Sequence, residues 1–134
     1  MIEAAMIARN IAPGLSRSYR IQDLPIYRAD LMEQARREAE ARIYPSGEYQ
    51  IRGADMDPEM IRISRENARR AGVEQDITFV TMDMRQSLDS LSAETTIVTN
   101  PPYGNRLQSE DLDSLYQQLQ SAISTHAGGY ISSV

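Results

Sequence analysis

The stretch TNPPYGN, residues 99–105, combines residue types that can hold a planar amino group. A β-branched run, TTIV, leads into Asn100, and the adjacent prolines end the predicted strand because they cannot donate to a ladder. The side-chain oxygen of Asn100 and the carbonyl of Pro101 are two acceptors for the two protons of an –NH₂ group. A tyrosine next to them can stack on the ring that bears this amine. We therefore predict a catalytic site for an amine, formed by Asn100, Pro101, Pro102 and Tyr103.

Two aspartates follow predicted strands upstream of this stretch, at positions that suit a nucleoside. Asp55, in IRGADMDP, ends a strand just before a helix, so its carboxylate can accept hydrogen bonds from both hydroxyls of a ribose. Asp57 is explained as a helix cap, whereas Asp55 has no evident local structural role; a turn aspartate is the alternative interpretation. Asp83, in FVTMDMRQS, ends the next strand, where it can accept from the exocyclic amine of an adenine.

The methionines that follow these aspartates suit the same ring. The backbone N–H of Met84 can donate to a ring nitrogen of the adenine. The side chains of Met56 and Met84 can enclose the two faces of the ring with polarizable surface. Ordinary core packing is the alternative interpretation of both methionines.

An alternation of helical and strand patterns is predicted to position these residues. Asp57 as N-cap, Pro58 in the first turn and Gly72 at the end delimit the helix that follows the first strand. Strands alternating with helices predict an α/β, doubly wound fold with a mostly parallel sheet, and ligands of such sheets bind beyond the carboxyl ends of the strands. The predicted helices cover residues 1–12, 30–42, 57–72 and 109–123, and the predicted strands cover residues 49–54, 77–83, 95–100 and 128–134.

The composition is typical of one globular domain. The chain has 134 residues, of which 41% are hydrophobic and 25% charged. It has no apolar run long enough to span a bilayer and no signal-peptide pattern, so we expect a cytoplasmic protein without a membrane partner. Without cysteine and with a single histidine, His126, a metal site is not expected. The net charge of −5 argues against a basic nucleic-acid clamp, but leaves room for an RNA-binding surface on another domain.

Three stretches carry a resemblance to a known family. IEAAMIARNIAPGLSRSY, IRGADMDPEMIRISRENARRAGV and TNPPYGNRL resemble the class I S-adenosylmethionine-dependent methyltransferases with an Asn-Pro-Pro-Tyr motif. More narrowly, they are similar to bacterial 23S ribosomal RNA guanine-N2 methyltransferases, which are often labelled N6-adenine-specific DNA methylases. The resemblance implies a Rossmann-like fold, S-adenosylmethionine as cofactor and ribosomal RNA as the substrate of the full-length protein.

The resemblance also implies a role for each candidate residue. Asp55 would bind the cofactor ribose and Asp83 the adenine amine, while the tetrapeptide that begins at Asn100 would hold the target amine in line with the sulfonium methyl group. The implied cofactor-binding set is Asp55, Met56, Asp83, Met84 and Asn100, and the implied catalytic set is Asn100, Pro101, Pro102 and Tyr103.

Family members carry a strand and a glycine-rich loop before the IEAAMIA helix, an N-terminal RNA-binding domain, and further strands after the last one predicted here. We therefore expect residues 1–134 to be a partial catalytic domain that binds the cofactor weakly or not at all by itself. The missing strand would leave inner sheet edges without partners, which favours self-association through those edges.

The substrate and the activity have alternatives at this stage. Guanine N2 in RNA, adenine N6 in DNA and a protein glutamine amide all present a planar –NH₂ group, and only the flanking resemblance favours RNA. A non-catalytic chain that acts as an oligomerising or partner-binding module is the alternative from another class.

Overall fold

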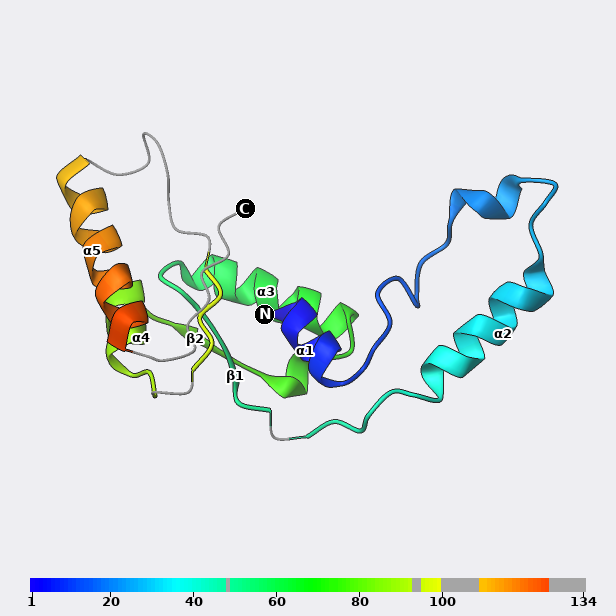
Figure 1. Cartoon of the computed structure of the whole chain (residues 1–134), viewed down its shortest axis with the longest axis horizontal. Coiled ribbons are helices and arrows are strands. Elements are labelled where there is room, and N and C mark those ends of the chain that lie inside the picture. The colour runs from blue at the N-terminus through cyan, green and yellow to red at the C-terminus, as the bar shows by residue number, and fades with distance from the viewer. Residues whose placement is uncertain (48, 93–94, 100–108, 126–134) are drawn as a thin grey trace. The chain divides into compact units, whose positions relative to one another are not determined.

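The computed structural model describes residues 1–47, 49–92, 95–99 and 109–125 (Figure 1). It contains both helices and strands, which confirms the predicted α/β class. In chain order the elements are α1 (Ile2–Ala8), the 3₁₀ helix η1 (Arg20–Asp23), α2 (Ala29–Glu40), β1 (Ile51–Asp55), α3 (Pro58–Arg70), the 3₁₀ helix η2 (Glu74–Asp76), β2 (Ile77–Thr81), α4 (Met84–Asp89) and α5 (Ser109–Thr125).

These elements form two compact units. The first unit contains residues Met1–Gly53 and Glu59–Phe79, and the second contains Ala54–Pro58 and Val80–Val134. Within the described residues, no helix is long and apolar enough to cross a membrane.

Strands β1 and β2 pair in a two-stranded parallel sheet, and α3 connects them. Gly53, in β1, lies directly against the ring of Phe79 in β2: a Cβ atom at Gly53 would meet Phe79 Cδ1 at 2.9 Å. Only a residue without a side chain therefore fits at this point of the strand. Helix α3 begins at Pro58, as predicted, and Gly72 takes the positive φ of 72° that a helix C-terminus favours.

The core of the first unit lies where α1, α3 and β2 meet. Two of its helical side chains, Ala5 and Ala68, are small and fully buried, and Phe79 contributes the one aromatic ring of this cluster. The buried members are Ala5, Ile61, Ala68, Val73, Ile77 and Phe79. By contrast, α2 is amphipathic but contains no buried residue.

A buried ion pair ties the chain after α1 to η2. Arg9 Nη1 lies 3.2 Å from Asp76 Oδ2, and the carboxylate of Asp76 also accepts from Ser46 Oγ at 2.7 Å and from the Gly47 N–H. Burial alone raises the pKa of Asp76, but the hydrogen bonds from Ser46, Gly47 and Arg9 outweigh it, so this pKa lies below its ordinary value. This pair was not predicted, because its partners are 67 residues apart in the sequence.

In the second unit, α4 lies against α5 (Figure 1). Leu115 and Leu119, one helical turn apart, are buried, which confirms the amphipathic helix predicted over 109–123. Helix α4 was not predicted.

Two of the predicted elements differ from the structure, and one cannot be compared with it. The predicted strand over 95–100 is wrong for residues 95–99, which have no strand structure, because a strand forms only with a ladder partner and these residues have none within the described part of the chain. The first helix ends at Ala8 rather than at residue 12, since Asn10 adopts a positive φ of 53°. The strand predicted over 128–134 lies outside the described residues.

Candidate functional site

The carboxyl ends of β1 and β2 are joined directly. Asp55 is the last residue of β1, and its carbonyl accepts a hydrogen bond of 2.9 Å from the N–H of Met82, just after β2. Asp83 is the next residue. Asp55 and Asp83, both in the second unit, therefore lie at the same edge of the sheet, as the sequence predicted.

The two carboxylates are held in the same way. Asp55 Oδ1 accepts from the N–H of Asp57 at 2.9 Å, and Asp83 Oδ1 accepts from the N–H of Arg85 at 2.8 Å. In both cases the chain forms a turn in which the aspartate side chain accepts from the backbone N–H two residues ahead. This corrects the sequence analysis, which found no local structural role for Asp55. Asp83 in turn is the N-cap of α4, the helix that the sequence analysis missed.

Each turn uses one carboxylate oxygen and leaves the other available. Asp55 and Asp83 are both exposed, and in the described residues the Oδ2 atom of neither one accepts a hydrogen bond. A carboxylate oxygen is an acceptor only, so each can take a hydroxyl or amine proton from a ligand. Because the turn already fixes each side chain, less rotational freedom is lost when a ligand binds.

The methionines beside these aspartates differ in exposure. Met56 is 75% exposed, so core packing, the alternative interpretation, is wrong for this residue. Met84 is half-buried as the first residue of α4. Met56 therefore presents apolar surface at the edge where the two carboxylates lie.

The predicted catalytic tetrapeptide, Asn100 to Tyr103, lies outside the described residues. The segment that leads to it, residues 95–99, alternates in exposure, with Ile97 half-buried and Val98 55% exposed. In the described part of the chain, no group of three or more histidine, cysteine or acidic side chains is arranged to hold a metal ion.

An α/β fold with carboxylates at the ends of neighbouring parallel strands is the pattern of a nucleotide-binding enzyme domain. Residues 1–133 match the family model of the RMKL-like methyltransferase domain, and the chain belongs to this family. This confirms the family that the three sequence stretches indicated.

Three relatives illustrate the match. Ribosomal RNA large subunit methyltransferase K/L of Vibrio campbellii is 35% identical over 140 residues, which cover 100% of this chain and 20% of that protein. The solved structure of SMU.472 complexed with SAH has a TM-score of 0.79 and 30% identity, and a "predicted N6-adenine-specific DNA methylase" from Listeria monocytogenes has 0.77 and 30%. Each alignment covers 97% of this chain and 34% of the solved one. The chain thus spans between a fifth and about a third of these relatives.

Proposed function

We propose that this chain forms part of an S-adenosylmethionine-dependent RNA methyltransferase that modifies a nucleobase amine, guanine N2 in ribosomal RNA. The observation that carries the proposal is the pair of exposed, turn-held carboxylates at the joined ends of β1 and β2. The family supports it, as do the SAH bound to SMU.472 and the ribosomal RNA named for the Vibrio protein.

The residues at the strand ends fit the nucleoside part of this cofactor. The free oxygen of Asp55 accepts from the ribose hydroxyls, and that of Asp83 accepts from the adenine amine. The N–H of Met84, in the first turn of α4, has no helical carbonyl to bind and donates to a ring nitrogen. Met56 and Met84 cover the ring faces, and Asn100 completes the cofactor site. When bound, the cofactor supplies an electrophilic methyl group.

The tetrapeptide presents the amine to that methyl group. Asn100 Oδ1 and the Pro101 carbonyl each accept a hydrogen bond from the amine. These two bonds aim the nitrogen lone pair at the methyl group, and Tyr103 stacks on the base. The N–C bond forms as the C–S bond breaks, sulfur keeps the bonding electron pair, and the nitrogen releases one proton to solvent. Alignment and the exclusion of water provide the rate enhancement, so no base with a shifted pKa is required.

The target base must be unpaired or turned out of its helix to reach this site. The name of the Listeria relative favours one other substrate, adenine N6 in DNA. Guanine in RNA and adenine in DNA differ in the ring that carries the amine and in the sugar. The methylated nucleoside that forms therefore identifies which of the two is the substrate.

The test is methyl transfer by the protein expressed from the complete reading frame that contains these 134 residues. Ribosomal RNA from cells lacking the gene and unmethylated DNA are each incubated with labelled cofactor, digested and separated as nucleosides. We expect label in N2-methylguanosine from RNA. Label in N6-methyladenine from DNA would change the assigned substrate from guanine in RNA to adenine in DNA. If the protein is folded and neither nucleoside carries label, the proposal is contradicted.

A further inference from the structure

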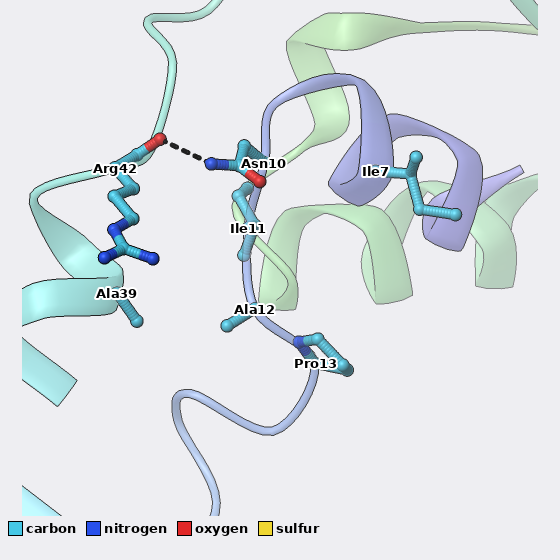
Figure 2. Close-up of a pocket in the computed structure, with 7 residues that line it drawn as sticks. All are labelled: Ile7, Asn10, Ile11, Ala12, Pro13, Ala39 and Arg42. Atoms are coloured by element: carbon cyan, nitrogen blue, oxygen red, sulfur yellow. Dashed lines mark hydrogen bonds between the residues drawn. The ribbon is translucent and has the colours of Figure 1, made fainter. Parts of the chain in front are cut away.

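A pocket of about 360 Å³ lies within the first unit, and none of the strand-end carboxylates lines it. It is formed by the end of α1 with the chain that follows it, and by the end of α2 (Figure 2). The lining residues are Ile7, Asn10, Ile11, Ala12, Pro13, Ala39 and Arg42.

Hydrogen bonds fix the two walls of this pocket to each other. Asn10 Nδ2 donates to the Arg42 carbonyl at 3.0 Å, which Figure 2 marks, and its positive φ turns the chain at this point. A second contact joins Arg9, next to Asn10, to Tyr44, two residues after Arg42. The Tyr44 N–H donates to the Arg9 carbonyl at 2.8 Å, and Arg9 Nε donates back to the Tyr44 carbonyl at 3.2 Å. Since Arg9 also holds the buried Asp76, the pocket walls are anchored to the core.

The pocket combines one cation with apolar surface. The guanidinium of Arg42 has no hydrogen bond or ion pair among the described residues, and none of the seven lining residues is acidic. Ile7 is 79% exposed, and the remaining lining side chains apart from Asn10 are alanine, proline and isoleucine. These walls therefore suit a ligand that joins an anionic group to a flat, weakly polar ring.

The acids of α2 do not neutralise this cation. Asp30 pairs with Arg28, Glu33 pairs with Arg37, and Glu38 accepts from Gln34. Glu40, the remaining acid of α2, forms no ion pair with Arg42 in the described part of the chain. Arginine is suited to phosphate because its planar group donates two parallel hydrogen bonds.

We propose that this pocket binds one nucleotide of single-stranded RNA, with the phosphate on Arg42 and the base against the apolar wall. The volume is at the lower end of the range for small-ligand pockets, as a single nucleotide requires. RNA-binding proteins commonly hold unstacked bases on such surfaces while a cation binds the backbone. The inference rests on the proposed function, and names a contact with the substrate outside the reacting centre.

The test measures binding of a fluorescein-labelled oligoribonucleotide by anisotropy, with protein from the complete reading frame. Arg42→Ala removes one phosphate contact. The plot of log association constant against log salt concentration should therefore become less steep by about 0.7, and the affinity at 0.1 M salt should drop about fivefold. Arg69→Ala is the control, because Arg69 is an exposed arginine on α3 that does not line the pocket. We expect its slope and affinity to match the unmodified protein.

A second pair of variants probes the pocket without removing an arginine. Ala39→Glu places a carboxylate in the pocket and is expected to weaken RNA binding at least as much as Arg42→Ala. Ala35→Glu makes the same change on the same helix, at an exposed residue outside the pocket, and is expected to have little effect. Circular dichroism confirms that each variant retains its helix content.

The outcomes separate this inference from the proposed function. Equal effects of Arg42→Ala and Arg69→Ala, with cofactor binding retained, overturn the pocket assignment alone. Absence of RNA binding by the unmodified protein overturns it as well, and if cofactor binding is also absent the proposed function fails with it. Binding of uridine monophosphate that depends on Arg42, without oligonucleotide binding, overturns the assignment to RNA in favour of a free nucleotide.

Discussion

Asp55 and Asp83 each have one oxygen bound by their own backbone and one exposed, and this division determines what a substitution changes. Asparagine keeps an acceptor for the N–H two residues ahead, so the turn persists while the negative charge is lost. The sequence alone placed both aspartates, because a carboxylate after a strand is a local pattern. It did not show that they are held by turns, and so it left their orientation open.

Asp55→Asn is expected to raise the Kd for S-adenosylmethionine about tenfold or more, since a hydrogen bond to a charged group contributes about 1.5–3 kcal/mol. Titration calorimetry on the protein from the complete reading frame measures this Kd. Asp57→Asn is the control: it removes a carboxylate two residues away, and asparagine caps a helix as well as aspartate does. Equal losses in both variants would show a general charge effect and contradict the role of Asp55.

Tyr103 is proposed to act through its ring and not through its hydroxyl. Tyr103→Phe should therefore retain most of kcat/KM for methyl transfer. Tyr103→Ala should lower kcat/KM by a factor that corresponds to about 1–3 kcal/mol of lost transition-state stabilisation, the contribution of stacking on one base. A large loss in the phenylalanine variant would instead assign a role to the hydroxyl.

At the scale of elements, β1 packs directly against β2, where Gly53 lies on the ring of Phe79. Gly53→Ala places a methyl group 2.9 Å from the Phe79 ring and should lower the free energy of unfolding by about 1–3 kcal/mol. Urea denaturation measures the change. Gly47→Ala is the control, since its Cβ would come no closer than 3.6 Å to another residue and its N–H is retained. A neutral Gly53→Ala would show that the strands can separate without cost.

Elements that depend on local signals were predicted well, and those that depend on distant partners were not. Asp57, Pro58 and Gly72 delimit α3 within a few residues, so its bounds were predictable. The run TTIV has strand propensity, but propensity does not supply a ladder partner, and residues 95–99 remain without strand structure. Helix α4 is only six residues long and lacks a repeating apolar pattern, which hid it.

At the scale of the whole molecule, Arg9 and Asp76 join segments that the sequence does not relate. Because the pKa of Asp76 is lower in the folded chain than in the unfolded one, its contribution to stability is complete well above pH 4 and is lost as pH falls through the folded pKa. Asp76→Asn should lower stability by about 3–5 kcal/mol at neutral pH, because it leaves Arg9 partly buried without its counter-charge.

Urea titrations between pH 7 and pH 2.5 test this dependence. The stability of the unmodified chain should fall more steeply below about pH 4 than that of Asp76→Asn, which has no such carboxyl to protonate. The difference between the two curves isolates Asp76 from the exposed carboxylates of Asp30 and Glu59, whose pKa values are lowered by Arg28 and Arg62 in both proteins. Parallel curves would contradict the assignment.

Helix α2 contains no buried residue, and this sets how fast its amide hydrogens exchange with solvent. An isolated helix of 12 residues is marginal in water, so α2 opens at a free energy near zero while α3 and β2 open only with the core. Its exchange is therefore independent of global unfolding. A ligand seated on Ala39 and Arg42 would slow exchange in α2 while leaving that of α3 and β2 unchanged. Deuterium uptake would then report occupancy of the pocket without a labelled ligand.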